Sequence, residues 1–204
     1  MKKIASLVLV SFLAASSAFA LEANVVGGLT SSAPIQNGTG VSYTARTALT
    51  YGALVDFDLI PAFMLETGIL SVGLKTRANP TSGIENDISQ RAMEIPLMAR
   101  FTLLPILSVG GGLYWQQFGS SYDTENVNTG IKVTNLSWEG SGYKRSDLGL
   151  KLAARAQFPV APMIHILADL SYKRGFTNLV SNPTAGESLK SNELALLVGA
   201  GVSF

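Results

Sequence analysis

The sequence predicts an all-β protein, namely an eight-stranded, antiparallel, up-and-down transmembrane β-barrel. Apolar and small or polar residues alternate with a period of two along several segments, as they do in strands that have two different faces. Hydrophobic residues make up 47% of the chain and charged residues only 14%, below the share of about a quarter that is usual in soluble domains. The expected connections alternate between short and long, which is typical of barrels that cross the outer membrane.

The last segment, Asn192–Phe204, shows this alternation most clearly. One face carries only apolar residues, among them Leu194, Val198 and Phe204, whereas the other face is largely small or polar. A uniformly apolar face is typical of a barrel strand whose outer side meets lipid. The alternative is the edge strand of a soluble sandwich, which the rest of the chain does not favour.

The first 20 residues have the pattern of a secretory signal peptide. Lys2 and Lys3 precede the apolar run Ile4–Ala15, and Ala18-Phe19-Ala20 matches the small-x-small cleavage pattern. Cleavage after Ala20 would leave 204 − 20 = 184 residues and change the net charge from +1 to 13 − 14 = −1. We therefore expect residues 1–20 to be removed and residues 21–204 to form one barrel domain in the outer membrane of a Gram-negative cell.

Charge and composition exclude several other classes. A nearly neutral mature chain offers no electrostatic basis for binding nucleic acid. The chain has no cysteine, which rules out disulfides, thiol catalysis and cysteine metal sites. No run after the first 20 residues approaches eighteen apolar residues, so we expect no transmembrane helix, and no motif calls for a cofactor or a metal.

Eight segments of the mature chain carry the strand pattern. Each places apolar residues on the outward parity, except that the upper half of the third segment, Leu70–Lys75, is ambiguous. The segments are Leu21–Thr30, Arg46–Asp58, the stretch that begins at Phe63, Arg91–Leu103, Leu107–Gly119, Ser146–Phe158, Met163–Gly175 and Asn192–Phe204.

The connections between these segments are of two kinds. The short ones contain proline, and the long ones are rich in Gly, Ser, Asn, Asp, Thr and Pro, which predicts irregular, solvated loops. Short periplasmic turns and long external loops are the outer-membrane arrangement. The short connections are Leu59–Ala62, Leu103–Ile106 and Pro159–Pro162. The long ones are Ser31–Ala45, Thr76–Gln90, Ser120–Arg145 and Thr177–Ser191.

Outward aromatic residues are expected to form two membrane girdles. One group lies beside the short turns or at the last residue, and the other lies about nine residues along the strands, which is roughly 22 Å at ~3.4 Å per residue and ~45° tilt. This separation is close to the height of the apolar band of a transmembrane barrel. The first group is Phe57, Phe63, Phe101, Phe158 and Phe204, and the second is Trp115 and Tyr172, with Tyr51.

The inward parity collects charged residues and glycines. Eight strands enclose an interior only wide enough for side chains, and charges of both signs can pair there, so we expect a salt-bridged plug and not an open pore. The predicted network consists of Glu66, Glu94, Arg100, Asp147, Lys151, Arg155, His165, Asp169 and Lys173.

Several strand segments resemble the outer-membrane β-barrel domain family that includes the PorT-like proteins and, more broadly, the small eight-stranded OmpA- and OmpX-like barrels. The resemblance covers most of the mature chain and implies the barrel fold, with no catalytic residues to carry over. PorT-like members are linked to secretion systems. The segments that carry it are Gly52–Leu59, Phe63–Leu70, Glu94–Phe101, Val109–Tyr114, Asp147–Leu150, Leu170–Leu179 and the terminal strand.

Enzymatic alternatives have weak support. Outer-membrane lipid A deacylases carry a His-x-Ser pair, but here Leu167 stands at the serine position after His165. His165 and Asp169 could form an acid–base couple, yet four residues along a strand separate them by roughly 13 Å, which favours a histidine in the polar plug. Asp56 and Asp58 could suggest a Ca²⁺ site, although aspartate beside a turn is common.

The longest connection, Ser120–Arg145, carries three aromatic residues among Gly, Ser and Asn. Tyr122, Trp138 and Tyr143 are candidates for recognition of an extracellular partner, because aromatic side chains in polar loops often bind ligands. The alternative is that Trp138 and Tyr143 pack on the rim of the barrel.

Together these patterns favour a non-enzymatic outer-membrane barrel with a structural or surface-interaction role. The alternatives are a small-solute channel or carrier and a lipid-modifying outer-membrane enzyme. The expected partners are outer-membrane lipid and lipopolysaccharide, the barrel-assembly machinery through the C-terminal strand, and an extracellular partner that the sequence does not specify. We expect a monomer.

Overall fold

The computed structural model describes residues 20–38, 41–60, 62–80, 83–139 and 141–204. Apart from Ala20, the predicted signal peptide lies outside these residues. In the described part of the chain, no helix has the length and apolar character needed to cross a membrane.

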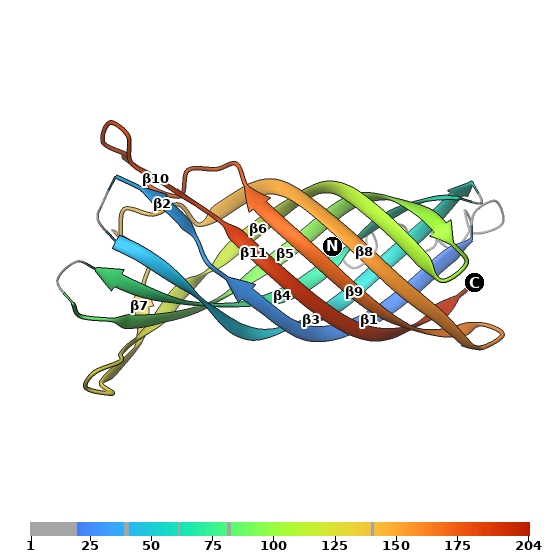
Figure 1. Cartoon of the computed structure of the whole chain (residues 1–204), viewed down its shortest axis with the longest axis horizontal. Coiled ribbons are helices and arrows are strands. Elements are labelled where there is room, and N and C mark those ends of the chain that lie inside the picture. The colour runs from blue at the N-terminus through green and yellow to red at the C-terminus, as the bar shows by residue number, and fades with distance from the viewer. Residues whose placement is uncertain (1–19, 39–40, 61, 81–82, 140) are drawn as a thin grey trace, which may run out of the picture.

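Strands make up nearly all of the described chain, and eight of them form the barrel (Figure 1). Three shorter strands lie in the connections at one end. The barrel strands are β1 (Leu21–Ser32), β3 (Val41–Ile60), β4 (Phe63–Pro80), β5 (Asn86–Leu104), β6 (Leu107–Asn126), β8 (Ser146–Ala161), β9 (Ile164–Gly175) and β11 (Asn192–Ser203). The short strands are β2 (Ile35–Asn37), β7 (Lys132–Ser137) and β10 (Ser188–Lys190).

The barrel closes between its first and last strands. Neighbouring strands pair antiparallel in the order β1, β3, β4, β5, β6, β8, β9 and β11, and β11 pairs back to β1. Glu22 lies opposite Ser203 in this last ladder, and the amide of Phe204 donates to the carbonyl of Leu21 at 2.8 Å. The prediction of an eight-stranded antiparallel barrel is confirmed.

The two ends of the barrel differ. At the short-turn end, where β1 begins and β11 ends, the strands are joined in pairs by the tight connections that precede β4, β6 and β9. At the opposite, loop end, the connections are longer and contain β2, β7 and β10 (Figure 1).

The strands reach further into the loop end than predicted. The prediction that Thr76–Gln90 forms a loop is wrong, because β4 continues to Pro80 and β5 begins at Asn86. β3 likewise begins at Val41, and β6 continues to Asn126 and pairs with β7. Polar residues occupy both parities in these extensions, so the membrane-strand pattern ends although the hydrogen-bonded ladder does not.

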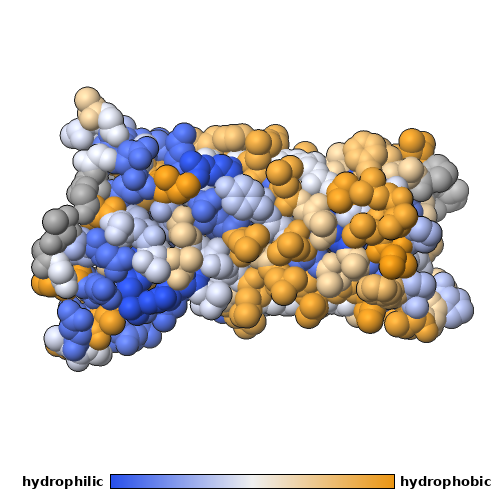
Figure 2. Space-filling view, in the orientation of Figure 1, coloured by the Kyte–Doolittle hydropathy of each residue, from blue (hydrophilic) through white to orange (hydrophobic). Residues whose placement is uncertain are grey.

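The outer surface of the barrel has a broad apolar band. Outward side chains such as Val25, Ile69, Leu97 and Val198 are each more than half exposed. Figure 2 shows the apolar surface extending from the short-turn end across much of the barrel and giving way to a hydrophilic surface at the loop end. This is the surface of a barrel that spans a bilayer and projects beyond it on one side.

The interior contains an apolar layer that the sequence pattern left ambiguous. The upper half of the third predicted segment turns Leu70, Val72 and Leu74 inward, where they are almost fully buried. They belong to a cluster with residues from other strands and from the loop-end connections: Val26, Leu54, Ala92, Phe118, Leu167, Leu179, Val180, Leu189 and Leu197.

Candidate functional site

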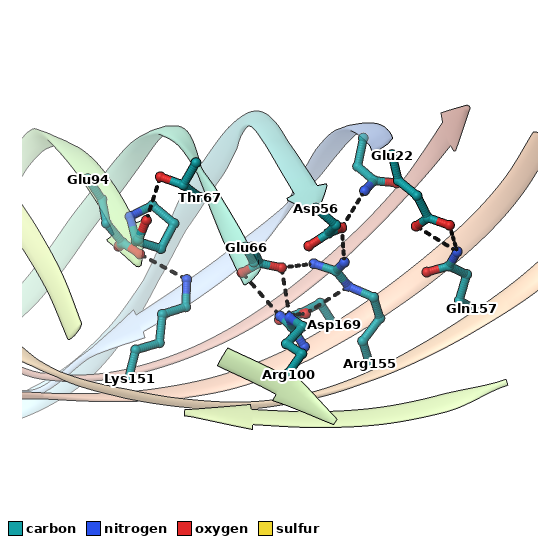
Figure 3. Close-up of polar contacts among 12 residues, drawn as sticks. Glu22, Asp56, Glu66, Thr67, Glu94, Arg100, Lys151, Arg155, Gln157 and Asp169 are labelled. Atoms are coloured by element: carbon teal, nitrogen blue, oxygen red, sulfur yellow. Dashed lines mark hydrogen bonds and ion pairs between the residues drawn. The ribbon is translucent and has the colours of Figure 1, made fainter. Parts of the chain in front are cut away.

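An arginine cluster fills the interior toward the short-turn end (Figure 3). Arg100 of β5 donates to Glu66 of β4 at 2.8 Å and to Asp169 of β9 at 2.5 Å. Arg155 of β8 donates to Asp56 of β3 at 2.7 Å and to Asp169 at 3.2 Å, and it also pairs with Glu66. All five side chains are buried, so each charge depends on its partners for solvation.

The pair between Arg155 and Asp56 crosses the full width of the barrel. In the ring of eight strands, β3 and β8 lie directly opposite each other, with three strands between them on each side. A direct ion pair between opposite walls places side-chain atoms across the interior at this level. The cross-section here is filled by charged groups, as expected for an eight-stranded barrel.

A lysine cluster lies beside the arginine cluster. Lys151 of β8 donates to Glu94 of β5 at 2.9 Å, and Lys173 of β9 pairs with both Glu94 and Glu193 of β11. The two lysines and two glutamates balance in formal charge, and all four are buried. The sequence pattern also assigns Glu193 to the inward face of the terminal strand, but the predicted charge network did not include it.

A glycine on a neighbouring strand leaves space for the side chain of Arg100 in the interior. A Cβ at Gly110 of β6 would lie 2.6 Å from Cγ of Arg100, so a larger residue would displace the arginine. Gly110 and Arg100 are directly opposite each other in the β5–β6 ladder. The glycine therefore provides the space that the long guanidinium side chain needs.

Two members of the predicted charge network, Asp147 and His165, lie outside the arginine and lysine clusters. Asp147 accepts a hydrogen bond from the Tyr114 hydroxyl at 2.8 Å and forms no ion pair with a described residue. His165 contacts Asn24 through Nε2 at 2.7 Å, and Asn24 in turn donates to Asp56 at 2.8 Å. Both residues are buried in the interior and extend the network by hydrogen bonds, and Nε2 of His165 also lies 3.9 Å from the carboxylate of Glu22.

Asp56 and His165, which were considered for a Ca²⁺ site and an acid–base couple, contact other side chains. Asp56 is engaged by Arg155 and Asn24, and no group of three or more metal-ligating side chains occurs in the described ranges. His165 and Asp169 face the same interior, but each contacts different partners.

The predicted girdle residues lie on the outer surface. Phe101, Phe158 and Phe204 are each close to half exposed or more, and Phe63 packs against Phe101 with ring centroids 5.0 Å apart. Phe57, which lies in β3 before the short turn to β4, is partly exposed. Trp115 and Tyr172 are exposed further along their strands, and the Tyr172 hydroxyl donates to Asn192 at 2.7 Å.

The loop-end connections fold over the barrel mouth and hold one another in place. β2 pairs with β10, and Tyr143 forms a β-bridge with Val180. The amide of Lys144 donates to the carbonyl of Leu179 at 2.7 Å, and the amide of Leu179 donates to the carbonyl of Leu189 at 2.8 Å. Because Leu179, Val180 and Leu189 are buried in the apolar layer, these connections form a packed cap.

The cap brings together the three aromatic residues singled out in the longest connection. Trp138 lies between Tyr122, at a centroid distance of 4.6 Å, and Tyr143, at 5.8 Å in an edge-on arrangement. All three line a largely apolar pocket of about 130 Å³ between the cap and the barrel wall. The sequence identified these residues, but it gave no reason to expect that Tyr43, Ile88 and Phe118 would complete the pocket.

The closed ring, the exposed apolar band and the buried charges define a transmembrane β-barrel of the outer-membrane type. The fold is similar to that of the outer-membrane protein OprG from Pseudomonas aeruginosa, at 10% identity, a TM-score of 0.56 and coverage of 90% of this chain and 95% of that one. It is also similar to the outer-membrane protease OmpT from Escherichia coli, at 11% identity, a TM-score of 0.55 and coverage of 91% and 97%. No protein-family model matches the chain, and no curated protein matches its sequence.

Proposed function

We propose that this protein is a closed, non-enzymatic outer-membrane barrel that acts at the cell surface through its loop-end cap. The observation that carries the proposal is the arginine cluster, in which Arg155 reaches Asp56 on the opposite wall. The lysine cluster and the apolar layer fill further parts of the interior. An interior occupied by paired charges and packed apolar groups favours a structural or recognition role over conduction.

The absence of an enzymatic role is part of the same proposal. The single histidine, His165, is buried in the interior and hydrogen-bonded to Asn24, and this position gives it no evident access to a lipid substrate. A carrier for small apolar solutes is the second candidate, because the cap holds an apolar pocket. The secretion role of PorT-like proteins has no specific support in the site.

Conductance across planar lipid bilayers tests the closed interior. Refolded protein should give no stable single-channel steps, because the charged clusters occupy the lumen. Stable, large steps would contradict the proposal and favour a transport role. Protein whose folding is verified by heat-modifiable mobility on gels should be used, so that silence reflects a closed barrel and not failed insertion.

The proposed location rests on the apolar band and the barrel closure. We infer that the short-turn end faces the periplasm and the cap faces outward, which is the usual orientation of such barrels. The terminal Phe204 is 65% exposed on the outer surface and its amide pairs with Leu21. Its deletion should reduce the folded protein found in outer-membrane fractions, and unchanged abundance would argue against a role for this residue in assembly.

A further inference from the structure

The pocket under the cap is lined by five aromatic side chains from separate parts of the chain. Barrel strands supply Tyr43 of β3 and Phe118 and Tyr122 of β6, and the connection before β8 supplies Trp138 and Tyr143. Phe118 is buried in the apolar layer, which forms part of the pocket floor. The pocket is therefore built jointly by the barrel and the cap.

The size of the pocket fits a molecule with one ring. Its volume is about 130 Å³. Apolar cavities of ~150 Å³ can bind benzene, so a pocket of this size is limited to a single six-membered ring with few additional atoms. Aromatic walls interact with an aromatic guest through edge-to-face and offset contacts, and Trp138 and Tyr143 already adopt an edge-on arrangement with each other.

The same pocket contains polar groups without partners. Nε1 of Trp138 and the side-chain oxygen of Gln90 are buried, and neither has a hydrogen-bond partner among the described residues. One is a donor and the other is an acceptor, and both side chains line the pocket. A buried polar group without a partner is destabilising, so a guest that reaches either atom after a small side-chain adjustment would gain a favourable hydrogen bond.

The surroundings of Tyr43 disfavour a negative charge in the pocket. Burial of this side chain, and then the neighbouring Tyr143, raise the pKa of the Tyr43 hydroxyl to about 12. The same desolvation would oppose a carboxylate placed beside it. Lys144 also lines the pocket, but its side chain is exposed to solvent, so an uncharged guest fits this largely apolar site better than an anionic one.

We propose that the pocket under the cap binds a small, uncharged aromatic molecule that carries one hydrogen-bonding group, such as an aromatic alcohol. This inference rests on the proposed function, because it specifies what the closed surface barrel recognises. The aromatic walls bind the ring, and Trp138 and Gln90 bind the polar group. Below this site lie the apolar layer and the ionic clusters, so the pocket is a binding site at a closed end.

Fluorescence provides a direct test with benzyl alcohol as the probe. The chain has two tryptophans, Trp115 on the outer surface and Trp138 in the pocket. In the Trp115→Phe variant, Trp138 is the remaining reporter, so partitioning of the probe near the membrane girdle does not contribute. Addition of benzyl alcohol to the refolded barrel should change the Trp138 emission and the change should saturate. A change that is absent or that rises linearly without saturation would overturn the proposal.

A matched pair of isoleucines separates pocket binding from general effects on the barrel. Ile88 lines the pocket, whereas Ile84, four residues earlier, is 51% exposed and does not line it. Ile88→Phe fills part of the space and should weaken binding by about tenfold or more, which is ~1.4 kcal/mol. Ile84→Phe should leave binding unchanged. Equal effects of the two substitutions would contradict the assignment of the site.

Two further measurements sharpen the ligand class and separate the two proposals. Benzoate should bind more weakly than benzyl alcohol, and equal or tighter binding of benzoate would refute the preference for an uncharged guest. Bilayer conductance should stay silent with and without benzyl alcohol. Saturable binding with large conductance steps would support the pocket but refute the closed barrel. A silent barrel without saturable binding would refute the pocket and leave the closed-barrel proposal standing.

Discussion

The two halves of strand β4 distribute polar and apolar side chains in opposite ways. In the short-turn half of β4, Ile69 points outward and Glu66 inward. From the next residue onward in the same strand, Leu70, Val72 and Leu74 are buried inside, and Lys75 lies in the outer wall. Along β4, the short-turn half therefore has an apolar outer face and a charged inner face, whereas the loop-end half resembles a strand of a water-soluble barrel.

This reversal follows from the solvent around each half. Lipid tails favour an apolar exterior, and the interior must then hold the polar residues of the alternating pattern, which are tolerated because they pair. Beyond the bilayer the exterior meets water, so apolar side chains gain by turning inward. The cap can pack onto the barrel only because the loop-end interior offers an apolar surface.

The largest expected effect comes from removing one cation from the arginine cluster. Arg155→Ala leaves Asp56 without its ion-pair partner and leaves Glu66 and Asp169 with Arg100 alone, so it should lower the free energy of unfolding by ~3–5 kcal/mol. Urea unfolding of protein folded in lipid vesicles measures the change. Lys132→Ala breaks an exposed pair with Asp123 at the loop end and should change stability by less than ~1 kcal/mol. Similar losses for both variants would remove the distinction between the two halves.

A charge placed on the apolar band should be the next most damaging change. Val198 is 59% exposed on the outer face, and Val198→Arg should cost ~2–4 kcal/mol if the position lies near the bilayer midplane. The matched change Ser42→Arg, on the exposed loop-end part of β3, should have little effect because the side chain meets water. The same vesicle unfolding assay compares them. Tolerance of arginine at both positions would argue against a lipid-facing band at Val198.

A cavity in the apolar layer should have an intermediate effect. Val72 is fully buried. Val72→Ala removes two buried methyl groups and should lower the free energy of unfolding by ~2 kcal/mol. Val133→Ala, at a 45% exposed position in β7, should be nearly neutral. Proteolysis of the cap at low protease concentration gives a second readout, since weaker packing of the layer should release the cap first. Equal sensitivity of both variants would indicate that the layer does not hold the cap.

The smallest effect concerns an ion pair on the hairpin that β4 and β5 form at the loop end. The hydrogen bond from Arg77, at 2.6 Å, holds the pKa of Asp87 below its ordinary value of 3.8. Because the folded pKa is depressed, the stabilisation is present above pH 3.8 and is lost as the pH falls through the lower, folded value. Urea midpoints measured across this acidic range should decrease for the native protein and decrease less for Asp87→Asn. An identical pH dependence in both would show that this pair does not contribute.

The sequence by itself determined the barrel and the identity of most interior charges. Period-two alternation assigns each residue of a membrane strand to one of two faces, so Glu66, Arg100 and Arg155 had to lie inside once Phe63, Phe101 and Phe158 lay outside. The aromatic candidates Tyr122, Trp138 and Tyr143 could also be found, because aromatic residues are conspicuous in a polar connection.

Only the tertiary structure decided which residues meet. Parity fixes a face but not a partner, so it could not show that Arg155 reaches Asp56 across the barrel while Asp147 binds Tyr114. The loop-end extensions were missed because, outside the bilayer, neither face of a strand needs to be uniformly apolar. The pocket depends on register and on cap packing, which bring Tyr43 and Phe118 to Trp138 from positions far apart in the chain. Such contacts follow from closure of the sheet, which no local pattern encodes.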